Sequence, residues 1–320
     1  MVKKFIIAID LGGTNLKCAL LSRSLKIKAR SSFNTKSFDN KHKLIQGIAD
    51  AIDSLILTQR LKRCAILGVG IGLPGPIDTL EGRVHFLPNI PGWKEVALKK
   101  ILEQKTKLPV FIDNDAKLMT LAEHQAGAAR KYRNALCLTL GTGVGGGLII
   151  NDLLYRGPDN AAGEAGHLPV NEKGPLCGCG ARGCLETYVG NHKIIQDAQK
   201  LFGPQITLER VSRLAQDNDP KAINFWSQVG RKLGLALSGM VNLLNLEVIV
   251  IGGGVACAGR VLLESVRQTI LLRAMQVQAR RVRVVSAQLG VDAGIMGAGY
   301  LVKERLGQFH PALHQGQSKL

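Results

Sequence analysis

Four potential metal ligands gather in the segment Gly163–Glu186, GEAGHLPVNEKGPLCGCGARGCLE. His167 precedes three closely spaced thiols, Cys177, Cys179 and Cys184. Three thiolates and one imidazole complete a tetrahedral structural zinc site and leave no open position for catalysis by the metal. A disulfide would leave one thiol unpaired and would need an oxidising compartment, so the spacing favours zinc.

Carboxylates stand where they could bind a polar ligand or move a proton. Glu164 and Glu186 bracket the Cys/His segment and could hold such a ligand beside it. The run Asp113-Asn114-Asp115 follows an apolar segment expected to be a strand. One helix N-cap explains Asp113 or Asn114 but not three consecutive polar groups. Asp115 is therefore the candidate general base, which accepts the proton of an attacking hydroxyl during phosphoryl transfer.

Glycine-rich turns suited to phosphate binding occur in two strand–turn–strand segments. In the first, Asp10 ends a predicted strand and is placed to orient Mg²⁺ through water. Gly12, Gly13 and Thr14 offer hydrogen-bond donors to an anion. A plain hairpin turn is the alternative. The second contains Gly141 and Thr142, and a further turn after a predicted parallel strand contains Gly253 and Gly254. Two such hairpins suggest that the chain has two related halves, which bind a nucleotide between them.

Two further loops expose backbone or amide groups to a ligand. The loop at 72–78 places Gly75 between two prolines, which leaves bare backbone for the close approach of a flat ligand. The loop at 89–93 begins with Asn89, whose amide can bond a hydroxyl.

The elements that must position these groups follow from apolar periodicity. Strands are expected at 5–9, 25–33, 65–71, 108–112, 134–140, 148–150, 247–251 and 282–286, with a further strand ending near 21. Helices are expected at 41–57, after 116, and at 185–201, 208–215, 220–244 and 292–306. This alternation predicts an α/β fold.

Composition narrows the class of protein. The 320 residues are 46% hydrophobic and 21% charged, typical of a globular chain. The sequence shows no signal-peptide core and no apolar run long enough for a membrane span, so we expect a cytoplasmic protein with reduced cysteines. The net charge of +18 is unusual and could attract a polyanion. A general basic bias is the simpler explanation, because no aromatic-interleaved basic motif supports nucleic-acid binding.

Together these motifs make the sequence similar to the ROK family of sugar kinases, within the actin-like, ribonuclease-H-like ATPases. The resemblance runs from about Phe5 to Leu306. It rests on the motifs DLGGT (10–14), LPGP (73–76), NDA (114–116), LGTGVGGG (140–147), GEAGH (163–167), CGCGARGCLE (177–186) and GGG (252–254).

The resemblance implies two α/β domains with a cleft between them: residues 1–115 plus 298–320, and residues 116–297 with the zinc motif. It implies that Asp115 is the base and that Mg²⁺ and ATP phosphates bind at Asp10, Gly12, Gly13, Thr14, Gly141 and Thr142. Gly253 and Gly254 would lie beside adenosine. Sugar-binding positions would be Gly75, Asn114, Glu164, His167 and Glu186.

The implied activity is ATP-dependent phosphorylation of a hexose 6-hydroxyl, with glucose favoured by the loop Asn89–Trp93. Alternatives are an N-acetylmannosamine or N-acetylglucosamine kinase, a polyphosphate-dependent glucokinase, and a sugar-sensing transcriptional regulator. A regulator is disfavoured because Phe5 starts the first strand directly, which leaves no room for a helix-turn-helix. The family resemblance also implies a homodimer. Lys117 stands where glucokinases of the family commonly have Asn; we expect a solvated helix residue, with a contact to phosphate or to Asp115 as the alternative.

Overall fold

The computed structural model describes residues 4–13, 15–35, 38–87 and 92–307. Contacts divide the chain into two compact units. Of the described residues, those up to 122, 156–162 and 291–307 form unit 1, and 123–155 and 163–290 form unit 2. The domain boundaries expected from the sequence, after residues 115 and 297, stay a prediction; the division by contacts falls after residues 122 and 290.

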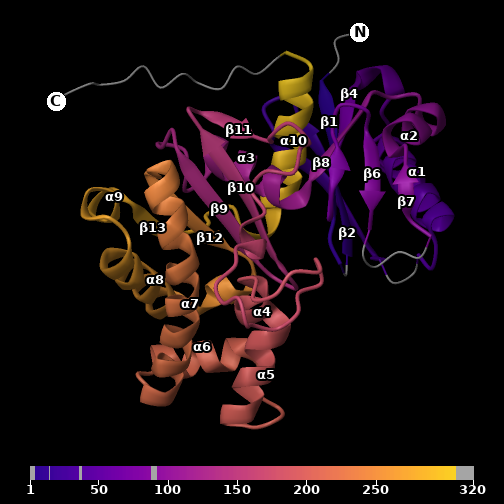
Figure 1. The fold of residues 1–320 in the computed structure, drawn as a ribbon. Helices are drawn as coiled ribbons and strands as arrows, with labels where there is room; N and C mark the ends of the chain where they lie inside the picture. The colour runs from indigo at the N-terminus through magenta and orange to yellow at the C-terminus, as the bar shows by residue number, and fades with distance from the viewer. Residues whose placement is uncertain (1–3, 14, 36–37, 88–91, 308–320) are drawn as a thin grey trace. The chain divides into compact units, whose positions relative to one another are not determined.

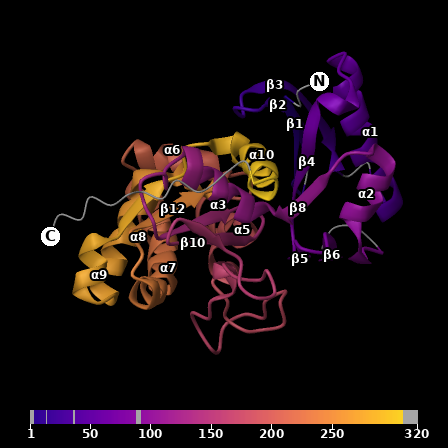
Figure 2. The same cartoon turned by 90° about the horizontal axis from the view of Figure 1, so that it is seen from above.

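The sheet of unit 1 has the strand order β3-β2-β1-β4-β8, with β3 labelled in Figure 2 and the other strands also in Figure 1. These strands are β1 (Phe5–Leu11), β2 (Asn15–Ser22), β3 (Ile27–Asn34), β4 (Ile66–Leu73) and β8 (Val110–Asn114). β1, β2 and β3 are antiparallel, whereas β1, β4 and β8 run parallel. Asp10 pairs with Gly72, which pairs with Asp113. The carboxyl ends of three strands therefore meet at one edge.

Alternating residues of β1 bury both faces of this sheet. Ile7 and Ile9 pack in one core with α1 (Lys41–Thr58) and α2 (Leu98–Thr106). Ile6 and Ala8 pack in another core with α10 (Ala293–Arg305), on the opposite side of the strands in Figure 2. α10 packs closely against β4 at Gly70, where a Cβ atom would overlap the backbone of Ala298.

The sheet of unit 2 repeats this pattern in the order β11-β10-β9-β12-β13. Its strands are β9 (Ala135–Leu140), β10 (Val144–Ile150), β11 (Leu153–Tyr155), β12 (Val248–Gly252) and β13 (Arg283–Ser286). Three antiparallel strands are again followed by parallel pairs. The expectation of two related halves is confirmed at the level of strand order.

The helices of unit 2 pack on this sheet around Phe225 and Trp226. They are α4 (Glu186–Val189), α5 (Asn191–Phe202), α6 (Leu208–Gln216), α7 (Pro220–Leu244), α8 (Arg260–Arg273) and α9 (Gln276–Arg281). The prediction of a single helix at 185–201 is wrong. Gly190 has extended backbone between α4 and α5, and the N–H of Asn191 leaves the helix to bond the carbonyl of Gly141 at 2.9 Å.

The remaining elements were only partly expected. A small sheet of β5 (Ile77–Asp78), β6 (Arg83–Phe86) and β7 (Lys94–Val96) was not predicted. The helix expected after residue 116 is α3 (Asp115–Ala126), and short 3₁₀ turns lie at η2 (Arg63–Ala65), η3 (Ala165–His167), η4 (Gly254–Ala258) and η5 (Gly290–Asp292). Within the described residues, no helix combines the length and apolarity that crossing a membrane requires.

Candidate functional site

Two acids of unit 1 lie on either side of one glycine. Asp10 is the penultimate residue of β1, and Asp115 begins α3, directly after β8. A Cβ atom built on Gly72 would lie 3.7 Å from Oδ1 of Asp10 and 3.6 Å from Cα of Asp115. The parallel strands β1, β4 and β8 thus bring the candidate Mg²⁺ ligand and the candidate base to the same edge of the sheet.

Asn114 fixes the start of the helix that carries Asp115. Its Oδ1 accepts hydrogen bonds from the backbone N–H of Ala116 at 3.0 Å and of Lys117 at 3.2 Å, as an N-cap does. Its Nδ2 donates to the carbonyl of Gly75 at 3.2 Å. The amide expected to bind a sugar therefore also ties the loop containing Gly75 to α3.

Burial disfavours the ionised form of Asp10. Desolvation raises the pKa of this carboxyl above its ordinary value of 3.8, and the positive charge of Lys17 only partly opposes the shift. The negative charge of this buried carboxylate is not fully balanced by nearby positive charge. The carboxylate is therefore suited to bind a cation, because a bound divalent ion would stabilise the charged form.

We predict that Asp10→Asn raises Tm in the presence of EDTA at neutral pH. A raised folded-state pKa means that the protonated acid stabilises the fold and that this stability is lost as pH rises through the folded-state pKa. The difference in Tm should shrink as pH falls and vanish below about 3.8, where both side chains are neutral. A scan of Tm against pH checks this result; a lower Tm for the variant at pH 7 would contradict it.

Asp113 holds a buried ion pair immediately before the catalytic candidates. Its Oδ2 accepts from Nε of Arg156 at 2.8 Å, and Arg156 also donates to Glu304 at 2.9 Å. Burial lowers the pKa of Arg156, but the two carboxylates outweigh it and raise the pKa above its ordinary value. Arg156 and Glu304 could not be identified from the sequence, because these partners lie far apart along the chain and no local motif marks them.

We predict that Arg156→Ala destabilises the protein by about 3 kcal/mol, because it leaves the Asp113 carboxylate buried without its cation. Tm should fall by about 6–12 °C. Adding Asp113→Asn should restore part of the loss. Arg231→Ala, which removes an exposed arginine of α7, is the matched control. An equal loss in the single and double variants would exclude the buried charge as the cause.

Lys117 is buried, so the expectation of a solvated helix residue is wrong. Its Nζ donates to the backbone carbonyl of Asn160. The side chain of Asn160 accepts from Oγ1 of Thr79 at 2.9 Å, and that hydroxyl accepts from Arg305 at 3.0 Å. Lys117 thus belongs to a polar network that holds the segment 156–162 against α3.

In unit 2 the structure brings the four expected metal ligands together. The ligand atoms of His167, Cys177, Cys179 and Cys184 all lie within 4.8 Å of one another. Backbone bonds fold the loop: Val170 donates to Gly183, and Cys177 donates to Ala181.

The geometry of this cluster fits zinc. Bonds of about 2.3 Å to sulfur and 2.0–2.1 Å to nitrogen place tetrahedral ligands about 3.8 Å apart for two sulfurs and about 3.6 Å for sulfur and nitrogen. The sulfurs of Cys179 and Cys184 are 3.7 Å apart, and Nδ1 of His167 is 3.6 Å from Sγ of Cys177. Burial raises the pKa of Cys184 to about 12, so a cation is needed to hold this thiol as thiolate at neutral pH.

The other expected residues of unit 2 lie around this cluster and the glycine loop. Glu164 is exposed and immediately precedes η3, whose last residue is His167. Oε2 of Glu186 accepts from the backbone N–H of Val144 at 2.7 Å. Gly141 and Thr142 follow β9, and Gly253 packs against the backbone of Leu140 at the end of that strand, with Gly254 next to it.

The first glycine turn is only partly described. The N–H of Gly12 donates to the carbonyl of Asn15 at 2.9 Å, which closes the turn between β1 and β2, and Gly13 is exposed. Thr14 and Asn89 lie outside the described residues.

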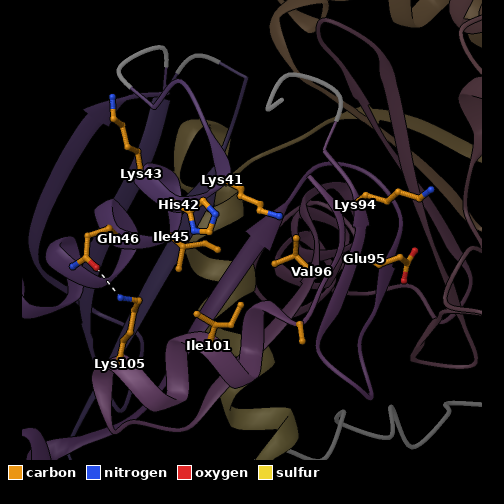
Figure 3. Close-up of a pocket in the computed structure, with 11 residues that line it drawn as sticks. Lys41, His42, Lys43, Ile45, Gln46, Lys94, Glu95, Val96, Ile101 and Lys105 are labelled. Carbon is orange, nitrogen blue, oxygen red and sulfur yellow. Dashed lines mark hydrogen bonds between the residues drawn. The ribbon is translucent and has the colours of Figure 1, made fainter. Parts of the chain in front are cut away.

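A pocket of about 620 Å³ in unit 1 contains none of the expected site residues (Figure 3). It lies between the start of α1, β7 and α2, and four lysines contribute to its lining: Lys41, Lys43, Lys94 and Lys105. Two of these bind neighbours: Lys43 pairs with Asp39 at 2.7 Å, and Lys105 donates to Gln46 at 2.8 Å. The pocket holds part of the excess positive charge of the chain.

Comparisons with known proteins agree over nearly the whole chain. The ROK family model matches residues 6–305. A glucokinase of Halalkalibacterium halodurans is 35% identical, over 95% of this chain and 97% of that protein. The structure of a ROK family glucokinase from Streptomyces griseus, in complex with glucose and AMPPNP, matches with a TM-score of 0.79 at 29% identity, over 94% of this chain and 99% of that one. A xylose repressor of Caldicellulosiruptor bescii is 30% identical, over 91% of this chain and 76% of that protein.

Proposed function

The chain belongs to the ROK family, has its actin-like ATPase fold and is a sugar kinase, and we propose that it phosphorylates the 6-hydroxyl of glucose with ATP. The observation that carries this proposal is the placement of Asp10 and Asp115 on either side of Gly72. Phosphoryl transfer needs a base at the attacking hydroxyl and a cation at the phosphates, and these acids suit the two tasks.

We propose the following roles. The carboxylate of Asp115 accepts the proton of the sugar hydroxyl while its oxygen forms the new bond to the γ-phosphorus and the bond to the departing ADP breaks. Asn114 holds the helix start that fixes this carboxylate. In unit 2, Glu164, Glu186 and Nε2 of His167 bind sugar hydroxyls, since Nδ1 of His167 faces the thiols.

We propose the following nucleotide-binding residues for each unit. In unit 1, Asp10 would bind the Mg²⁺ that accompanies ATP, and Gly12 and Gly13 would face the phosphates. In unit 2, Gly141 and Thr142 would do the same, and Gly253 and Gly254 would lie beside adenosine. When bound, Mg²⁺ would neutralise part of the negative charge of the phosphoryl group. Zn²⁺ at the cluster would fix the tautomer and orientation of His167 without taking part in the reaction.

A coupled assay with glucose, mannose, fructose, N-acetylglucosamine and N-acetylmannosamine tests the proposal. We expect the highest kcat/KM with glucose and ATP. A preference for an acetylated amino sugar would identify the alternative kinase, and turnover with polyphosphate in place of ATP would identify the alternative donor. Turnover on none of these sugars would overturn the proposal.

The similarity to a xylose repressor supports one second candidate, a sugar-responsive regulator. A salt-dependent mobility shift with DNA, together with an absence of kinase activity, would favour it. We also propose a homodimer, which light scattering on the purified protein checks.

A further inference from the structure

The carboxylate of Glu186 lies against the glycine loop that follows β9. Its Oε2 accepts the backbone N–H of Val144 at 2.7 Å. A Cβ atom added to Gly143 would overlap the same oxygen, so glycine is needed there for the carboxylate to reach the loop. The contact therefore involves two consecutive residues of the loop.

The first residue of the next helix, α5, holds the loop at its other end. Gly190, which follows α4, is followed by Asn191, whose N–H donates to the carbonyl of Gly141 at 2.9 Å. The N–H of Gly141 in turn donates to the carbonyl of Gly143 at 2.9 Å. Side chain and backbone around α4 thus fix both ends of the segment 141–144.

The position of Glu186 is itself fixed by the Cys/His cluster. Cys184 belongs to that cluster and lies two residues before Glu186. The hydroxyl of Thr187 donates to the carbonyl of Cys184 at 2.8 Å, and the N–H of Leu185 donates to the carbonyl of Leu168 at 2.9 Å. A continuous series of contacts therefore runs from the cluster to the glycine loop.

We propose that Glu186 is a positioning residue for the nucleotide: its Oε2 preorganises the loop 141–144 for the phosphates of ATP. A carboxylate has two oxygens, so Oε1 can accept a bond from a sugar hydroxyl while Oε2 holds the loop. One side chain then serves both substrates, and sugar binding improves nucleotide binding. This inference rests on the proposed function, because ATP is assigned to the loop there.

The test is a double-mutant cycle between Gly143→Ala and Glu186→Ala. Gly143 does not have a positive φ, so alanine adds a methyl group without backbone strain. Each single variant should weaken AMPPNP binding about tenfold, the effect of losing one hydrogen bond to a charged group. The double variant should lose little more than either single variant, because removing the carboxylate makes room for the added methyl group.

Titration calorimetry with AMPPNP, with and without glucose, gives the readout. Glucose should tighten AMPPNP binding in the wild type and not in Glu186→Ala. Gly239→Ala is the control for adding a methyl group, since no atom apart from the neighbouring backbone of its own helix lies within 4 Å of the added Cβ. Glu172→Ala is the control for removing an exposed acid. An unchanged zinc content and Tm in each variant would exclude unfolding as the cause of weaker binding. Glu186→Gln keeps the side-chain length and an acceptor oxygen, so it should retain part of the AMPPNP affinity that Glu186→Ala loses.

The outcomes separate two failures. The positioning role would be overturned by additive losses of affinity in the double-mutant cycle. It would also be overturned if Glu186→Ala raised KM for glucose without changing AMPPNP binding. Either result would leave the kinase assignment intact. A wild type that neither binds AMPPNP nor phosphorylates a sugar would overturn the proposed function and this inference together.

Discussion

Replacing Asp115 by Asn should lower kcat by about 10²–10⁴-fold, the usual contribution of a general base. Asparagine keeps the size of the side chain and its acceptor oxygen, which can still bond the N–H of Ala116 as Oδ1 of Asp115 does at 2.8 Å. The start of α3 should therefore persist, and only the capacity to accept a proton is lost. Steady-state kinetics with glucose and ATP, together with glucose affinity from calorimetry, check this result.

Asp50→Asn is the matched control for this change. Asp50 is exposed on α1 and accepts a bond from Gln46, which asparagine can also accept. Its kcat should equal that of the wild type. If Asp115→Asn retained a near-normal kcat, Asp115 would not be the base; if KM rose with kcat unchanged, the residue would serve binding alone.

Removing the metal should have the second largest effect. We expect one zinc ion per chain by mass spectrometry of the intact protein, and its loss from Cys177→Ser or Cys184→Ser. Because metal binding supplies folding energy, Tm should fall by about 10 °C or more. Sugar binding should weaken as well, since His167 loses the partner that fixes its ring.

Cys64→Ser is the control for the thiol substitutions, because Cys64 is exposed and lies outside the cluster. It should keep its zinc and its Tm. A wild-type protein that contains no zinc after purification without chelators, or a Cys177→Ser variant as stable as the wild type, would contradict the assignment.

The sequence was most informative where function depends on nearby residues. The Cys/His cluster is brought together because its ligands lie within one short, glycine-rich loop. Asp10 and Asp115 lie at the same edge of the sheet because they stand near the carboxyl ends of the parallel strands β1 and β8. The sheets themselves could be predicted from apolar runs such as Ile66–Leu73, which is buried throughout.

The rest depends on contacts between distant residues, which no local pattern reveals. Arg156 pairs with Asp113 and Glu304, and Lys117 is buried because Asn160, far along the chain, supplies its acceptor. The role of Glu186 in holding the glycine loop depends on Val144, which lies on another element. The apolar residues beside Cys64 and Cys257 favour burial in the core, but both thiols are exposed.

Gly294 in the first turn of α10 has a consequence for engineering the stability of this enzyme. Exchanging a helical glycine for alanine is a routine stabilising step, worth up to about 1 kcal/mol. Here the new methyl carbon would lie 2.5–2.7 Å from the carboxyl atoms of Asp10 and would force them away. Gly294→Ala would therefore displace the carboxylate that we propose as the Mg²⁺ ligand, so a substitution chosen for helix propensity alone should lower turnover at this position.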